Sequence, residues 1–257
     1  MTMPLHIETV PCLQDNYAYV LHDDITRRTA LVDAPEVEPI RELLVGRGWE
    51  LSDLLITHHH SDHIDGVADL HKIYDCRVIG AQADQHRLPT LDLAVGETDV
   101  EAVCGEEVHI IDVPGHTVGH IAFYMPGAQA LFSADSLMSC GCGRLFEGTP
   151  AQMWESLLKM RKLPDETTVY SGHEYTLTNI RFALTLEPEH EALKSRLQTA
   201  EDLRKADKPT LPVSLAEEKR TNPFLRADDP ALKAAIGMEG ASDEDVFAEI
   251  RKRRDSF

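Results

Sequence analysis

The first two thirds of the chain alternate short apolar runs with segments of helical periodicity. Apolar runs of strand length are typical of β-strands, and apolar positions three or four residues apart are typical of amphipathic helices. The pattern predicts strands over 6–11, 17–21, 30–32, 54–57, 77–79, 108–113, 121–125, 131–133 and 169–171. It predicts helices over 37–47, 67–74 and 152–163, with Gly48 closing the first and Thr149-Pro150 opening the last. Strands in two series with helices between them indicate a layered α/β domain with two sheets between helices.

The strand signals end near Tyr175, and the remainder of the chain shows only helical periodicity. Apolar residues recur at helical spacing up to Leu203, and Pro209–Pro212 then breaks that helix. Capping residues predict three further helices, which begin at Ser214, Asp229 and Ser242. We therefore expect a large α/β domain over residues 1–174 and a small helical domain over residues 175–257.

The composition is that of an acidic globular protein. Hydrophobic residues make up 42% and charged residues 27% of the 257 residues, which allows a sizeable buried core. The 25 basic and 44 acidic residues give a formal charge of −19, and so acidic a surface repels nucleic-acid phosphates and anionic lipid. No stretch approaches the ~20 apolar residues of a membrane span. We therefore expect a protein that binds neither nucleic acid nor membrane.

The cysteine content and the start of the chain bear on the cellular compartment. Five cysteines at scattered positions are an odd number, which predicts reduced thiols rather than a disulfide framework. Cys140 and Cys142 have one residue between them, whereas redox and zinc motifs have two. Residues 1–8 contain neither the basic segment nor the apolar stretch of an export signal. Together these features predict a cytoplasmic protein.

Residues 57–63, THHHSDH, are the most informative segment for chemistry. They follow a predicted strand, and a helix that starts near Ile64 would stabilise the turn. Four side chains can then surround a common centre: His58, His60, Asp62 and His63. Imidazole and carboxylate groups are ligands of divalent zinc, iron and manganese. His59 alternates away from its neighbours, so we expect it to have a structural role.

Three more potential ligands stand at the ends of later strands, each directly after a small residue. They are His116, Asp135 and His173. Metal sites are usually closed by ligands from distant loops, and packing alone does not explain this coincidence. His120 is expected to support the metal loop rather than to bind an ion. The remaining histidines are expected to be ordinary surface or core residues: His6, His22, His71, His86, His109 and His190.

The run His-x-His-x-Asp-His with a later histidine, aspartate and histidine resembles the metallo-β-lactamase superfamily from about Ile7 to Glu174. This resemblance implies an αββα sandwich of two mixed sheets between helices. It also implies two ion sites, one held by His58, His60 and His116 and the other by Asp62, His63 and His173. Asp135 would bridge the two ions. Every ligand position of the superfamily pattern is present, whereas class B β-lactamases replace some of them.

Further motifs resemble glyoxalase II, the hydroxyacylglutathione hydrolase family, over nearly the whole chain. They are CLQDNY at 12–17, CGCGRLFEGT at 140–149, GHEYT at 172–176, TNPFLR at 221–226 and RKRRDSF at 251–257. The resemblance implies that glutathione contacts Arg144, Phe146, Tyr175, Arg251 and Arg254. Arg144 and Phe146 depart from the lysine and tyrosine common in the family, so a positive charge is kept and a hydroxyl is lost.

The resemblance also implies a reaction, the hydrolysis of S-D-lactoylglutathione to D-lactate and glutathione in methylglyoxal detoxification. Two divalent ions, with zinc expected ahead of iron or manganese, would share a hydroxide that attacks the thioester carbonyl. Asp135 would be catalytic as the bridge between the ions, and Asp62 would orient the hydroxide and accept its proton. The enzyme would act on this small molecule as a monomer.

Three alternatives remain open from the sequence. A persulfide dioxygenase of the same fold would use one iron ion and oxygen, and would not need Asp62 and His63 as ligands of a second ion. A lactone hydrolase would share the two ions but not the glutathione contacts. A catalytically silent metal-binding scaffold predicts lost ligands, and none is lost in this sequence.

Overall fold

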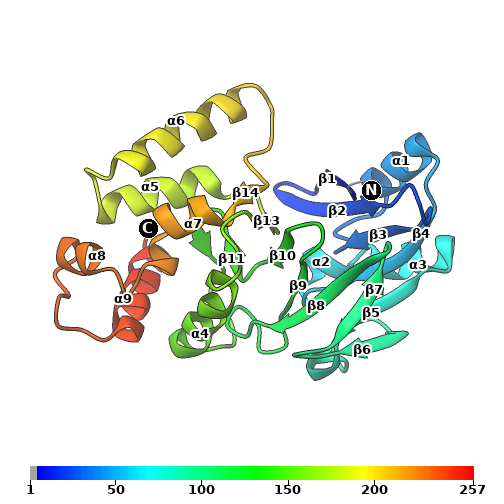
Figure 1. Ribbon diagram of the computed structural model, residues 1–257, viewed down its shortest axis with the longest axis horizontal. Coiled ribbons are helices and arrows are strands. Elements are labelled where there is room, and N and C mark those ends of the chain that lie inside the picture. The colour runs from blue at the N-terminus through cyan, green and yellow to red at the C-terminus, as the bar shows by residue number, and fades with distance from the viewer. Residues whose placement is uncertain (1–4) are drawn as a thin grey trace. The chain divides into compact units, whose positions relative to one another are not determined.

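The computed structural model describes residues 5–257 and contains two compact units. One unit comprises the chain up to Asp112 together with 118–133, and the other comprises 113–117 together with 134–257 (Figure 1). Residues 1–4, which belong to the segment considered for an export signal, lie outside the described residues. The chain passes from one unit to the other several times, so these units do not test the domain boundary predicted after residue 174, which stays a prediction.

The first unit contains a six-stranded mixed sheet in the order β1-β2-β3-β4-β5-β6. Its strands are β1 (His6–Cys12), β2 (Asn16–His22), β3 (Thr29–Val32), β4 (Leu51–Leu55), β5 (Arg77–Ala81) and β6 (Leu93–Val95). The first three strands pair antiparallel, and β3 to β6 pair parallel. β2 and β3 are buried along their whole length, as expected of strands covered on both faces.

Helices connect the parallel strands, because parallel neighbours need a crossover. α1 (Glu38–Arg47) joins β3 to β4, and the short α2 (Ser61–Ile64) and α3 (Val67–Tyr74) join β4 to β5. α1 ends where the sequence predicts, because Gly48 adopts the left-handed φ of 68° that closes a helix. A 3-10 turn, η1 (Gln82–Asp84), follows β5.

Four strands of a second sheet also lie mainly in the first unit, in the order β10-β9-β8-β7. They are β7 (Val100–Val103), β8 (Glu106–Asp112), β9 (Ile121–Met125) and β10 (Ala130–Ala134). Tyr19 of β2 packs against Phe132 of β10 with ring centroids 5.8 Å apart. The two sheets therefore face each other across an apolar core. The short strands β6 and β7 were missed by the sequence pattern, and only one residue of each is fully buried.

The second unit is mostly helical. Its helices are α4 (Pro150–Arg161), α5 (Thr176–Leu186), α6 (Glu191–Lys205), α7 (Leu215–Thr221), η2 (Pro223–Leu225), α8 (Pro230–Ala235) and α9 (Asp243–Asp255). Short strands form two pairs, β11 (Leu137–Met138) with β12 (Gly141–Cys142) and β13 (Thr168–Ser171) with β14 (Val213–Ser214). The predicted caps form, because the side chains of Thr149, Ser214, Asp229 and Ser242 each accept a backbone N–H.

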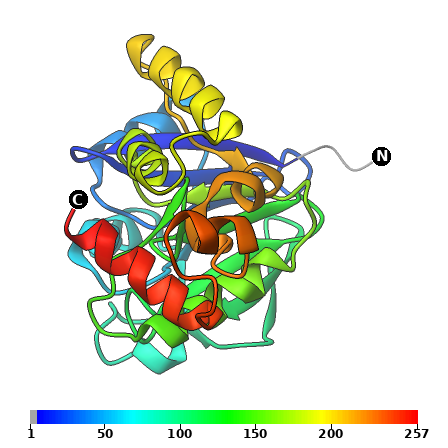
Figure 2. The same ribbon diagram turned by 90° about the vertical axis from the view of Figure 1, so that its left-hand side faces the viewer.

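The helical core of this unit includes two positions of the predicted periodicity, Leu193 and Ala200 of α6, whereas helix α5 was not predicted. α5 and α6 pack against each other (Figure 1) around a buried cluster of Cys140, Ile180, Ala183, Leu193 and Ala200. α9, red in Figure 2, packs against α4, where the ring centroids of Trp154 and Phe247 are 5.9 Å apart. Among residues 5–257, no helix is both long and apolar enough to cross a membrane.

Candidate metal centre

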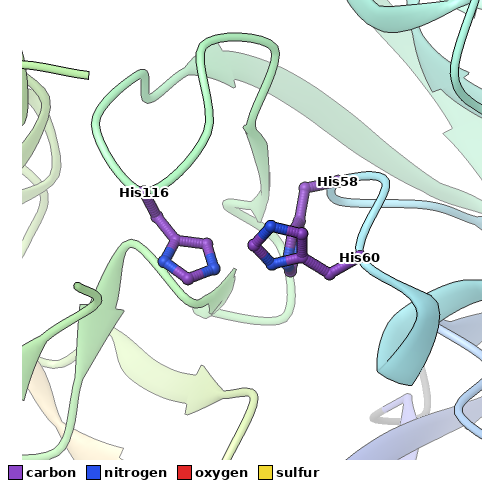
Figure 3. Close-up of side chains that lie close together, drawn as sticks. All are labelled: His58, His60 and His116. Atoms are coloured by element: carbon purple, nitrogen blue, oxygen red, sulfur yellow. The ribbon is translucent and has the colours of Figure 1, made fainter. Parts of the chain in front are cut away.

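Two of the predicted ligands, His58 and His60, lie on the loop that follows β4 (Figure 3). Hydrogen bonds between neighbouring strands hold the start of this loop in place. The N–H of Ile56 donates to the carbonyl of Ile79 over 2.8 Å, so the chain stays against β5 as far as the histidine run. His58 is fully buried, and its Nε2 lies 3.2 Å from Nδ1 of His60. Figure 3 also draws His116, whose side chain comes from the loop after β8 in the second unit. The loop after β4 therefore aims two imidazole nitrogens at one point.

Asp62 and His63 lie within helix α2, which begins at Ser61 and not near Ile64 as the sequence suggested. His60 adopts an extended conformation, and its carbonyl accepts the N–H of His63 over 2.9 Å, which opens the helix early. Asn16 donates through Nδ2 to both the backbone oxygen and Oδ2 of Asp62, over 3.0 Å each. The CLQDNY motif thus supports the Asp62 carboxylate, a role that its spacing did not reveal.

Asp33, just after β3, anchors the histidine run from within the fold. Its carboxylate accepts the N–H of Thr57 over 2.9 Å, the hydroxyl of Thr57 over 2.8 Å and Nδ1–H of His63 over 2.8 Å. Asp33, His58 and His63 could also be grouped as metal ligands, but these hydrogen bonds already occupy both oxygens of Asp33. Asp33 was not predicted as a supporting residue, because one aspartate after a strand is not a distinctive signal.

These hydrogen bonds select the ring nitrogens that are available to a metal. The Thr57 hydroxyl gives its single hydrogen to Asp33, so at 3.0 Å from His58 it accepts Nδ1–H of that ring. Nδ1–H of His63 is likewise used by Asp33. Each ring therefore keeps the lone pair on Nε2, the arrangement in which a hydrogen-bond acceptor orients a metal-binding histidine.

His59 and His120 have the supporting roles that their positions suggested. Nδ1 of His59 lies 2.9 Å from a carboxylate oxygen of Asp84, and its ring meets the His60 ring edge-on with centroids 5.0 Å apart. His120 is buried and stacks on His58 with ring centroids 4.6 Å apart and an interplanar angle of 12°. The stacking restricts the rotation of the His58 ring.

The second unit brings together the three strand-end ligands. His116, Asp135 and His173 are 3%, 5% and 5% exposed. Oδ2 of Asp135 lies 3.4 Å from Nε2 of His116 and 3.3 Å from Nε2 of His173. Nδ1–H of His116 donates to the carbonyl of Arg144 over 2.8 Å, which again places the lone pair of the ring on Nε2. One carboxylate thus stands between two imidazoles, as a bridging ligand requires.

Glycines allow the segments that carry these ligands to approach closely. A Cβ on Gly143 would lie 1.9 Å from the backbone oxygen of Asp135, and a Cβ on Gly148 would lie 2.6 Å from Cα of Gly115. Between these glycines, the N–H of Phe146 donates to the carbonyl of His116 over 3.3 Å. The glycines of the CGCGRLFEGT motif therefore have a steric role beside the candidate ligands His116 and Asp135.

Two sets of neighbouring side chains, His58 with His60 and Asp135 with its two histidines, have distances that fit a metal ion better than direct hydrogen bonds. Ligands about 2.0–2.1 Å from a tetrahedral zinc ion stand roughly 3.3–3.4 Å apart. The His58–His60 nitrogens are 3.2 Å apart, and Asp135 lies 3.4 and 3.3 Å from its two histidines. Charge-assisted N–H···O bonds are shorter, about 2.7–2.9 Å. Both sets therefore have the spacing and the donor chemistry of a divalent metal site.

Three of the predicted glutathione contacts flank the ligands of the second unit. The Phe146 ring, 61% exposed, meets the His116 ring edge-on with centroids 5.3 Å apart, and the guanidinium of Arg144 lies 5.7 Å from the Phe146 centroid. Tyr175 stacks on His173 with centroids 4.8 Å apart and an interplanar angle of 6°. Exposed aromatic and cationic groups thus stand beside two candidate metal ligands.

The two cations of the last helix differ in their surroundings. Arg251 is 6% exposed, donates to the carbonyl of Cys142 over 3.0 Å and pairs with Asp255 at 2.8 Å. Arg254 is partly exposed, and its Nη2 and Nε lie 3.2 and 3.4 Å from Oδ1 of Asn179. Arg251 therefore has a structural function in this chain, and its contact with glutathione stays a prediction.

No cysteine has the properties of a nucleophile. All five thiols are free and buried. Burial raises the pKa of Cys140 to about 12 and that of Cys142 to about 11, although nearby arginines counteract the shift. The thiols are therefore protonated at neutral pH, and the chemistry rests with the histidines and carboxylates.

The fold and the ligand sets define a class of protein. Residues 15–173 match the model of the metallo-beta-lactamase superfamily. The crystal structure of ETHE1 from Myxococcus xanthus shares the fold, with a TM-score of 0.67 and 24% identity over 97% of this chain and 90% of that one. The crystal structure of TTHA1623 in a di-iron-bound form has a TM-score of 0.61 and 25% identity over 86% of this chain and 100% of that one. The predicted fold class is therefore confirmed.

The family within this superfamily follows from the second part of the chain and from full-length relatives. Residues 174–257 match the model of the hydroxyacylglutathione hydrolase C-terminus. The hydroxyacylglutathione hydrolase of Ruegeria pomeroyi is 57% identical over 255 residues, 99% of this chain and 100% of that protein. The hydroxyacylglutathione hydrolase of Roseobacter denitrificans is 54% identical with the same coverage. The chain therefore belongs to the hydroxyacylglutathione hydrolase family.

Proposed function

We propose that this protein hydrolyses S-D-lactoylglutathione to D-lactate and glutathione, as the thioesterase of methylglyoxal detoxification. The observation that carries the proposal is the match of both parts of the chain, the ligand-bearing residues 15–173 and the C-terminal residues 174–257, to one family. The relatives that share this name align from end to end. A lactone hydrolase or a dioxygenase of the same fold would not require the second match.

The proposed metal site combines the two ligand sets. We assign His58, His60 and His116 to one ion, and Asp62, His63 and His173 to the other. Support comes from the ring nitrogens and carboxylate oxygens of these groups, each of which could hold an ion. Asp135 is assigned as the bridge, because its Oδ2 lies beside a histidine of each group.

Two bound divalent ions would lower the pKa of a shared water and polarise the thioester carbonyl. In the proposed reaction, Asn16 holds the carboxylate of Asp62 in one orientation, so that Asp62 can direct the attacking water and take up its proton. The departing thiolate needs no protonation by a side chain, because the pKa of a thiol is only about 8.5. No serine or cysteine nucleophile enters the reaction.

The glutathione moiety is proposed to bind along residues of the second unit. Phe146 and Tyr175 offer aromatic surfaces beside His116 and His173, and Arg144 and Arg254 offer positive charge. Glutathione carries two carboxylates, and a planar guanidinium binds a carboxylate through two parallel hydrogen bonds. The helical residues 175–257 would thus form the larger part of the substrate-binding domain.

The decisive experiment loads metal-free protein separately with zinc, iron or manganese and measures turnover of S-D-lactoylglutathione. We expect two ions per chain and the highest kcat/KM with zinc. Asp135→Ala should lose metal and nearly all activity, whereas Asp228→Ala, which removes only a surface ion pair with Arg161, should retain both. A limit of one ion in metal-replete protein, or oxygen consumption without thioester turnover, would contradict the proposal.

A further inference from the structure

Asn179 uses both ends of its side-chain amide within the second unit. It lies on α5 and is 5% exposed. Its Nδ2 donates to the carbonyl of Ser139 over 3.0 Å, and its Oδ1 accepts from Nη2 and Nε of Arg254 over 3.2 and 3.4 Å. One amide therefore connects helix α9 to the hairpin of β11 and β12.

The guanidinium of Arg254 is held by uncharged groups. It lies over the rings of Phe182 and Phe257, 5.9 and 5.8 Å from their centroids. Among the described residues, no carboxylate forms an ion pair with Arg254, and the neighbouring Asp255 pairs with Arg251. Burial and the charge of Arg251 lower the pKa of Arg254, whereas Asp255 acts in the opposite direction. A cation oriented in this way remains able to bind an anion.

The amide also reaches the segment that carries the other predicted cation. Ser139 stands in the turn between β11 and β12, and Arg144 lies two residues after the end of β12. A Cβ on Gly141 would lie 2.5 Å from Nδ2 of Asn179, so this glycine leaves room for the amide. Asn179 thus contacts both chain segments from which the proposed glutathione cations arise.

We propose that Asn179 is a positioning residue for substrate recognition, which turns the guanidinium of Arg254 so that its remaining N–H groups bind a carboxylate of glutathione. This inference rests on the proposed function. A neutral acceptor is required, because an aspartate in its place would pair with Arg254 and cancel the charge that attracts the substrate. The amide nitrogen is required as well, because it alone can donate to Ser139.

The experiment compares Asn179→Asp and Asn179→Ala with the wild-type holoenzyme. The substrates are S-D-lactoylglutathione and the same thioester with its glycine carboxylate converted to an ethyl ester. Gln198→Glu is the matched control, because it makes the same amide-to-acid change on the exposed face of α6. The measured quantity is the ratio of kcat/KM for the free acid to kcat/KM for the ester.

In the wild type and in Gln198→Glu, we expect the free acid to be preferred by roughly tenfold to a hundredfold, the usual strength of a hydrogen bond to a charged group. Asn179→Asp should bring the ratio close to one by raising KM for the free acid, with kcat and metal content unchanged. Asn179→Ala, which adds no charge, should lower this ratio severalfold. If the aspartate variant does not fold, the alanine variant alone tests the inference.

A merely structural role of Asn179 would weaken turnover of both substrates alike and leave the ratio unchanged, and that result overturns the inference. Equal turnover of acid and ester by the wild type overturns it as well. An absence of thioester turnover in the metal-loaded wild type would instead refute the proposed function, and the inference with it.

Discussion

The replacement Asp33→Asn tests whether the histidine run depends on this buried carboxylate. Asp33 accepts hydrogen bonds from the N–H and hydroxyl of Thr57 and from Nδ1–H of His63. Asparagine has nearly the same shape but offers one oxygen and an NH2 group. In the wild type, every one of these buried donors meets an oxygen of Asp33. In either orientation of the asparagine amide, at least one of them would face the NH2 group instead.

In the less damaging orientation of the asparagine amide, its oxygen still faces His63, and the N–H of Thr57 has no acceptor. A buried donor without a partner costs about 1–3 kcal/mol of unfolding free energy. In the other orientation, His63 loses the acceptor that holds its proton on Nδ1, and the proton can move to Nε2. Loss of such an acceptor typically lowers metal affinity by about tenfold to a hundredfold, which corresponds to roughly 1.4–2.7 kcal/mol.

Competition with a chromophoric zinc chelator measures this affinity directly. Asp53→Asn is the matched control, because Asp53 is also a fully buried carboxylate but pairs with Arg28 and Arg77 instead of the metal ligands. We expect Asp53→Asn to lower stability and leave zinc affinity unchanged. A zinc affinity of Asp33→Asn within about twofold of the wild type, a difference of less than about half a kcal/mol, would show that metal binding does not depend on the Asp33 carboxylate.

Three further outcomes follow from the structure. Glu218→Ala removes the partner of the buried Arg196 and should lower the free energy of unfolding by about 3–5 kcal/mol in chemical denaturation. Glu38→Ala, which removes an exposed ion pair, should lower it by less than about 1 kcal/mol, and equal losses would contradict this expectation. Because burial raises the pKa of every thiol, to about 11 or 12, iodoacetamide near neutral pH should label none of the five cysteines before unfolding and all afterwards. Gly148→Ala places a Cβ 2.6 Å from Cα of Gly115 and should lower zinc affinity, as chelator competition would show.

Features that depend on neighbouring residues could be predicted from the sequence. The caps at Thr149, Ser214 and Ser242 form as expected, because a cap needs only a side-chain oxygen and a backbone N–H three residues on. Gly48 closes α1 because it adopts a left-handed conformation at little cost. The chemical nature of the candidate metal ligands was also readable, since imidazoles and carboxylates are concentrated at strand ends. Local geometry and residue type were sufficient in each case.

Features that depend on residues far apart in the chain needed the tertiary structure. Asp33 supports Thr57 across 24 residues and His63 across 30, and Asn179 meets Arg254 across 75, distances over which no sequence spacing is informative. The four cations at 251–254 look alike in the sequence, yet helix packing buries Arg251 and leaves Arg254 partly exposed. The sequence determines the chemistry of a side chain, but its burial and its partners are set by which surfaces pack together. Packing therefore buries Arg251 against the fold and leaves Arg254 partly exposed.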